Sequence, residues 1–210
     1  MVNMIIGLLC ALAGGYMGHY FTVKMFNDRV KAQNKALYDE FEIIKDIFAS
    51  HIKGLLDDFD SNLKSKYSGL RKLDMSFVNS LLLELAASKD IPSKEVRLLI
   101  KNLNQVSANL SEKIYRRESK IEEWFNASLN IEPKDRFAFK SSLQFHTGGL
   151  LLVAIDVIYH TSKVLRDRNH FQFSSPSHIE FAEVACKVSG IYFDKQVWER
   201  IVSGSFSVTK

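Results

Sequence analysis

Residues 4–23 read MIIGLLCALAGGYMGHYFTV, and no Asp, Glu, Lys or Arg occurs anywhere in residues 1–23. Twenty helical residues at about 1.5 Å each reach about 30 Å, which is the thickness of the hydrocarbon layer of a bilayer. A buried helix of a soluble domain is usually shorter and keeps a polar edge. The stretch therefore predicts one transmembrane helix, and we assign residues 1–23 to a membrane anchor.

A cleaved signal peptide is the alternative for this stretch, because Ala11-Leu12-Ala13 matches the small-x-small pattern of a cleavage site. A signal peptide also needs a basic segment before its apolar core. Residues 1–4 carry no basic side chain, and the apolar run continues well past Ala13. We therefore expect the segment to be retained as an anchor.

The charges that flank the stretch predict its orientation. Lys24, Arg29, Lys31 and Lys35 follow it, against the single acidic Asp28. Positively charged flanks remain on the cytoplasmic side. We expect a short N-terminus outside the inner (cytoplasmic) membrane, a cytoplasmic C-terminal part, and contact between these four basic side chains and lipid headgroups.

Small residues recur along the predicted span. Gly7, Ala11 and Gly15 stand four apart, and Gly14 and Gly18 form a GxxxG pair. Small residues at this spacing let a second helix approach closely, which predicts packing against another copy or a partner. The alternative is that small residues are simply common in membrane helices.

The remaining composition favours an all-α chain. Only three prolines occur in 210 residues, and only six glycines lie in the long part of the chain after the predicted span. Such a shortage of breakers favours long helices. The two cysteines, Cys10 and Cys186, are too far apart in this layout to pair, which suits a reducing compartment.

Residues 24–69 predict a long amphipathic juxtamembrane helix that forms a stalk or a short coiled coil. Apolar residues recur there at the helical period, and Ser68-Gly69 is the expected end, because glycine terminates helices at little cost. The apolar stripe comprises Val30, Leu37, Phe41, Ile44, Phe48, Leu55 and Phe59.

Residues 70–203 predict a helical bundle domain, and residues 204–210 a flexible tail. We expect helices over 74–88 and 93–129, a helix after Pro133 that is interrupted at 146–149, and a buried central helix over 150–159. Two short helices should follow, capped by Ser177 and Asp194, and Gly190 should end the first of them.

One pair of residues is a candidate for catalysis. Asp156 and His160 are four residues apart inside the apolar run, so they share a helix face as the orienter and the base of an active site would. No motif positions a nucleophile beside them. We therefore expect a structural hydrogen bond and no enzyme activity.

The sequence contains little that indicates metal, cofactor or nucleic-acid binding. No metal-ligand spacing, phosphate loop or dinucleotide pattern occurs, so we expect no metal and no cofactor. The basic cluster Lys113, Arg116, Arg117 and Lys120 is interleaved with glutamates, which is typical of a solvated helix face, and the net charge is only +4. We expect no nucleic-acid partner.

The sequence thus predicts a single-pass, membrane-anchored helical interaction or scaffold protein. Its composition favours a component or regulator of a bacterial envelope assembly of the conjugation, secretion or phage/plasmid exclusion type. Its expected partners are the membrane and other proteins, including further copies of itself through the span and stalk. The alternatives are a membrane-anchored enzyme that uses Asp156 and His160, and an exclusion or immunity factor that faces outwards.

Overall fold

The computed structural model describes residues 2–60, 66–88, 90–127 and 133–204. Every regular element within these ranges is helical. The six α-helices are α1 (Val2–Asp60), α2 (Ser76–Ala86), α3 (Lys94–Ala127), α4 (Pro133–Asp167), α5 (His178–Ser189) and α6 (Lys195–Ser203), and a 3-10 turn, η1 (Arg168–His170), follows α4. The prediction of an all-α chain is confirmed.

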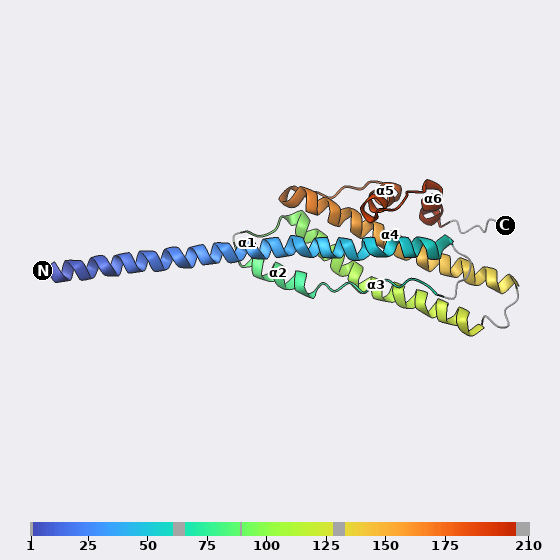
Figure 1. Cartoon of the computed structure of the whole chain (residues 1–210), viewed down its shortest axis with the longest axis horizontal. Helices are drawn as coiled ribbons and strands as arrows, with labels where there is room; N and C mark the ends of the chain where they lie inside the picture. The colour runs from blue at the N-terminus through green and yellow to red at the C-terminus, as the bar shows by residue number, and fades with distance from the viewer. Residues whose placement is uncertain (1, 61–65, 89, 128–132, 205–210) are drawn as a thin grey trace.

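The helix α1 is one unbroken rod with two environments (Figure 1). Its N-terminal part extends away from the rest of the molecule, and its C-terminal part lies inside a bundle with α2, α3 and α4. From residue 9 of α1 onwards, Val30 is the first buried residue. The predicted span and the following amphipathic segment therefore form a single helix, with no hinge between them.

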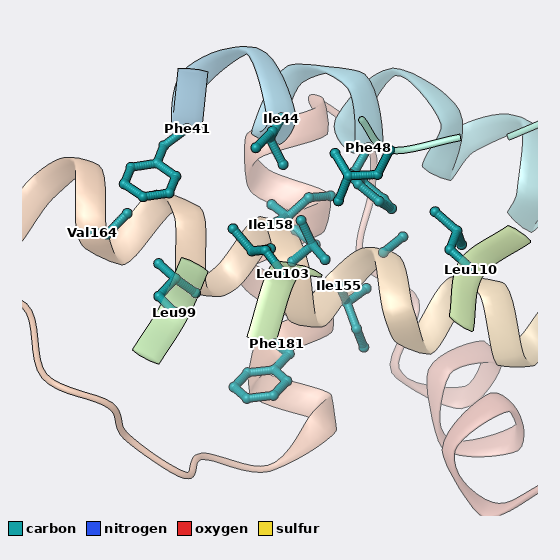
Figure 2. Packing of buried hydrophobic residues seen from close by; sticks show 14 of the residues in the cluster. Phe41, Ile44, Phe48, Leu99, Leu103, Leu110, Ile155, Ile158, Val164 and Phe181 are labelled. Carbon is teal, nitrogen blue, oxygen red and sulfur yellow. The ribbon is translucent and has the colours of Figure 1, made fainter. Parts of the chain in front are cut away.

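The amphipathic stripe of α1 is buried as its periodicity indicates, but its partner is not a second stalk. All seven stripe residues from Val30 to Phe59 are at most 4% exposed. They pack mainly on α4, and Figure 2 shows Phe41 beside Val164 and Ile44 near Ile158. The division into a stalk over 24–69 and a separate domain over 70–203 is therefore wrong, because most of the stalk supplies the core of the bundle.

The helix α1 ends at Asp60, not at Ser68–Gly69. Residues 66–75 run without helix along the bundle and bury Leu70, Leu73 and Met75. The segment is fixed where the backbone N–H of Ser68 donates to Asp58 Oδ2 at 2.7 Å. Burial of these three apolar side chains in a non-helical segment takes the place of the helix predicted over residues 66–69.

The helix α4 passes through residues 146–149 without a break, contrary to the predicted interruption. Two helical glycines cost about 1 kcal/mol each relative to alanine. The burial of Thr147, Leu150 and Leu151 on either side outweighs this cost. The central apolar run is buried as predicted, with Ala154, Ile155, Val157 and Ile158 at most 1% exposed.

Most of the predicted caps are confirmed. Ser93 Oγ accepts from the backbone N–H of Val96 at 3.3 Å, and Ser177 Oγ accepts from that of Glu180 at the same distance. Asp194 Oδ1 accepts from the backbone N–H of Gln196 at 2.9 Å. Gly190 ends α5 with a φ of 67°, a left-handed conformation that glycine adopts without strain.

The bounds of α2 differ from the prediction, and most of the predicted tail cannot be compared with the structure. The helix α2 is shorter than residues 74–88, and Asp74 Oδ1 accepts from the backbone N–H of Ser76 just before it starts. The predicted tail lies outside the described residues, except for Gly204, which ends α6 in the left-handed conformation.

Candidate functional site

The projecting part of α1 carries a continuous exposed apolar surface. By length and composition, α1 and α4 are the helices of the described residues that are long and apolar enough to cross a membrane. None of the apolar window of α1 is buried, whereas half of that of α4 lies inside the bundle. The exposed large apolar residues of α1 before Val30 are Ile5, Ile6, Leu9, Leu12, Tyr16, Met17, Tyr20, Phe21, Val23, Met25 and Phe26.

The predicted packing residues lie on this projecting segment. Gly7, Ala11, Gly14, Gly15 and Gly18 are all exposed, and a Cβ atom built on any of the four glycines meets no atom within 4 Å. The surface they form is therefore open in the single chain. It has room for another helix at close range.

The predicted headgroup contacts are exposed, but one of them is engaged with the bundle. Arg29 Nη2 lies 2.9 Å from Glu84 Oε2, and the Gln33 side-chain amide donates to the same oxygen. Lys24, Lys31 and Lys35 remain at the surface. Arg29 thus joins the start of the buried part of α1 to the end of α2.

The main polar contact inside the bundle was missed by the sequence analysis. Arg117, predicted to be part of a solvated basic face, is 2% exposed, and its Nη2 lies 2.7 Å from Asp58 Oδ2. Its Nε donates to Thr147 Oγ1 at 3.0 Å, and its Nη1 donates to the Ser68 carbonyl at 2.6 Å. One side chain thereby joins α1, the 66–75 segment, α3 and α4.

The helical phase contains a signal for this position. Arg117 follows Leu110 by seven residues and Ile114 by three, so it continues the buried stripe of α3. A charged residue on a buried stripe requires a partner of opposite charge. Asp58 is such a residue, because it follows Leu55 by three residues and so continues the buried stripe of α1. Burial lowers the pKa of Arg117, and the Asp58 carboxylate opposes this effect.

Asp156 and His160 lie together, as their spacing predicts. Asp156 Oδ1 is 3.4 Å from His160 Nε2, with 45% of the aspartate side chain and 12% of the histidine side chain exposed. The pair lines a cavity of about 330 Å³ between α3, α4 and residues 173–176. The imidazole packs edge-on against Phe173 and Phe181.

Among the described residues, the polar atoms around the pair either lack a hydrogen-bond partner or bind other side chains. His160 Nδ1 is buried and has no hydrogen-bond partner among the described residues. Ser174 Oγ also lines the cavity, but it interacts with Lys163 Nζ at 2.8 Å and Tyr159 Oη at 3.1 Å. In the described part of the chain, no hydroxyl or thiol hydrogen-bonds to a ring nitrogen of His160.

The basic cluster on α3 borders a second cavity, of about 580 Å³, that lies between α3, α4 and α6. Two of its side chains are paired along the helix: Arg116 with Glu112, and Lys120 Nζ with Glu123 Oε2 at 2.6 Å. His146 faces this cluster from α4. Burial lowers the pKa of His146, and nearby Lys120, Arg116 and Lys113 lower it further.

A metal centre finds no support within the described ranges, since they contain no group of three or more His, Cys, Asp or Glu side chains that is arranged to hold an ion. Cys10 is exposed on the projecting helix, and Cys186 is buried beside Trp198 in the bundle. Comparisons of the chain with protein-family models, with curated proteins and with solved structures find no match.

Proposed function

We propose that this protein is a single-pass, membrane-anchored interaction or scaffold protein of the inner (cytoplasmic) membrane. In this proposal α1 crosses the bilayer, and the helical bundle serves a bacterial envelope assembly of the conjugation, secretion or phage/plasmid exclusion type. The observation that carries the proposal is the contrast along one helix. From Ile5 to Phe26 α1 exposes its large apolar side chains, whereas from Val30 to Phe59 its apolar stripe is buried against other helices of the chain.

The energetics of exposure support a membrane as the partner of this segment. Contiguous apolar surface on a water-soluble monomer is rarely so extensive. Each large apolar side chain moved from water into hydrocarbon gains about 1.5–3 kcal/mol. Nine such side chains are exposed between Ile5 and Val23, which is more than enough to retain a helix in a bilayer.

A matched pair of substitutions tests the anchor. Leu12 lies near the middle of the uncharged stretch and is 63% exposed, and Tyr115 lies on α3 in the bundle and is 70% exposed. An arginine at the centre of a span costs about 2.5–3.5 kcal/mol on insertion. We expect Leu12→Arg to reduce the fraction of protein that resists extraction from membranes at alkaline pH, and Tyr115→Arg to leave it unchanged. Equal extraction of both variants would contradict the anchor.

Protease access in intact spheroplasts tests the orientation. With a tag after Lys210, we expect the tag to survive until the membrane is permeabilised, since the basic flank from Lys24 to Lys35 favours a cytoplasmic bundle. Digestion from outside would support the alternative of an outward-facing exclusion or immunity factor. The size of the protein before digestion would also show whether the chain is cleaved after Ala13.

The proposal assigns no enzyme activity to the chain. The alternative, an enzyme centred on Asp156 and His160, is favoured by one observation, which is that the pair lines a cavity. Replacing both residues by alanine, with circular dichroism to verify the fold, separates the two proposals. A scaffold should retain its biological function in this variant, and an enzyme should lose it.

A further inference from the structure

The distance between the predicted span and the bundle is short. Val23 is the last residue of the uncharged stretch, and Val30 is the first buried residue after it. Seven residues of continuous helix separate them by about 10 Å. The headgroup layer on each side of a bilayer is about 5–7 Å thick. A bundle joined to a span by this rod begins at the membrane surface.

The corner between α2 and α3 is the part of the bundle nearest to the span. Glu84 accepts hydrogen bonds from Arg29 and Gln33, which places the end of α2 beside the first buried turn of α1. The turn η1, which follows α4, lies deeper in the bundle. Asn169 Oδ1 accepts from Tyr38 Oη at 3.0 Å, at a position eight residues beyond Val30 along α1. Figure 1 shows the turn after α2 at the end of the bundle from which α1 projects.

This corner combines exposed apolar and basic side chains. Leu83 is 75% exposed and Ile91 is 46% exposed, although Leu81 and Leu85 on the same helix as Leu83 are buried. Lys31 on α1 and Lys94 at the start of α3 are exposed. Apolar side chains flanked by lysines are the chemistry of protein surfaces that bind at the interface of an anionic membrane.

We infer that the α2–α3 corner is a second membrane contact, which inserts Leu83 and Ile91 among the headgroups of the leaflet from which α1 emerges. This inference rests on the proposed function, because it requires α1 to span the bilayer. The corner packs against α1, the same continuous helix that carries the span, so two contacts fix the tilt of the bundle. The bundle is then held at a set angle to the membrane.

Fluorescence quenching in nanodiscs of phosphatidylethanolamine and phosphatidylglycerol tests the inference on the full chain. Ala87, exposed between the two apolar residues, is replaced by cysteine and labelled with an environment-sensitive dye, in a background with Cys10 and Cys186 changed to alanine. Met17 on the span and Tyr115 on the distal part of α3 receive the same label as reference positions. Spin-labelled lipids with shallow or deep quenchers report the depth of each dye.

We expect the Ala87 label to be blue-shifted and quenched by the shallow quencher, the Met17 label to be quenched by the deep one, and the Tyr115 label to be quenched by neither. Leu83→Glu together with Ile91→Glu should return the Ala87 label to the emission of the Tyr115 label, and circular dichroism verifies that the fold is intact. Quenching of Met17 without quenching of Ala87 would overturn the second contact and leave the span in place. Absence of quenching at Met17 would overturn the proposed anchor itself.

A second arm tests the role of charge. In nanodiscs of phosphatidylcholine alone we expect weaker quenching of the Ala87 label, because Lys31 and Lys94 no longer attract an anionic surface. Equal quenching in both lipids would overturn the preference for anionic lipid.

Discussion

The Arg117 guanidinium donates to the Asp58 carboxylate at 2.7 Å, with the two side chains 3% and 2% exposed, inside the helical bundle. A buried charge that loses its partner keeps its desolvation cost without compensation. Arg117 also donates to Thr147 and to the Ser68 carbonyl, so its loss removes one polar link of the 66–75 segment to α3 and leaves Thr147 without this donor.

Removal of this arginine should destabilise the bundle strongly. We expect Arg117→Met to lower the free energy of unfolding by about 3–5 kcal/mol. In the double variant Arg117→Met/Asp58→Asn, the asparagine oxygen still accepts from the Ser68 backbone N–H and no charge remains buried, so part of the loss should be recovered. Urea unfolding of the full chain in detergent, followed by circular dichroism, measures both variants. A double variant less stable than Arg117→Met would contradict this interpretation.

Two glycines in long helices should respond to alanine in opposite directions. A Cβ atom on Gly54 would meet the Ser68 side chain, with Ser68 Cβ only 2.9 Å away, whereas on Gly149 the nearest atom is Lys113 Nζ at 3.9 Å. Alanine gains up to about 1 kcal/mol in a helix over glycine, and an overpacked contact costs about 1–3 kcal/mol. We expect Gly149→Ala to raise the free energy of unfolding and Gly54→Ala to lower it. The same urea titration measures both variants. A higher free energy of unfolding for both would contradict the prediction and would show that the 66–75 segment can move away from Gly54 at Ser68.

The stability of the bundle should depend on His146 below neutral pH. The pKa of His146 is lowered in the folded chain, so between that value and the usual value near 6.5 the unfolded chain binds more protons. The contribution of neutral His146 to the free energy of unfolding is fully present above the pKa of an unperturbed histidine. It is lost as the pH falls through the lower pKa that His146 has in the folded chain. We expect the urea midpoint to fall from about pH 8 to about pH 5, and to fall less in His146→Gln. An unchanged slope in His146→Gln would exclude His146 as the cause.

The glycine surface of the projecting helix should mediate self-association. Cys10 lies four residues before Gly14 and eight before Gly18, on the same helix face. If two spans pack on this face, mild oxidation of membranes should yield a Cys10 disulfide dimer. We expect Gly14→Leu/Gly18→Leu to abolish the dimer on non-reducing gels. Cys10→Ala provides the negative control, and a dimer that persists in the leucine variant would show that the spans meet on another face.

The sequence predicted which face of a helix is buried, but it did not predict which other helix packs on that face. The stripe from Val30 to Phe59 is buried as predicted, since the helical period alone decides which side of a helix is apolar. What covers that side depends on α4, which lies about 100 residues further along the chain, and no local pattern encodes this pairing. A stripe that reads as a coiled-coil stalk is therefore the core of a bundle.

The course of α4 through its glycine pair and the burial of Arg117 were also not predicted from the sequence. Gly148 and Gly149 carry a local cost that favours a break, but the burial of their neighbours overrides it. Arg117 was assigned to a solvated face because charges surround it in sequence, although its phase places it with Leu110 and Ile114. At both positions burial against other helices decides the local structure, and the composition of a short stretch of sequence carries no information about that burial. The spacing of Asp156 and His160, in contrast, is a property of one helix and was predicted correctly.

The pairing of α1 with α4 has a consequence for the synthesis of the chain. Tyr38 and Asn169, which share a hydrogen bond, are 131 residues apart. At about 5–20 residues per second, the ribosome needs roughly 7–26 s to supply the partner after Tyr38 is made. During that interval Phe41, Phe48 and the rest of the stripe are without their native cover. The nascent chain therefore presents a long apolar helix face, and folding of the bundle must wait for its second half.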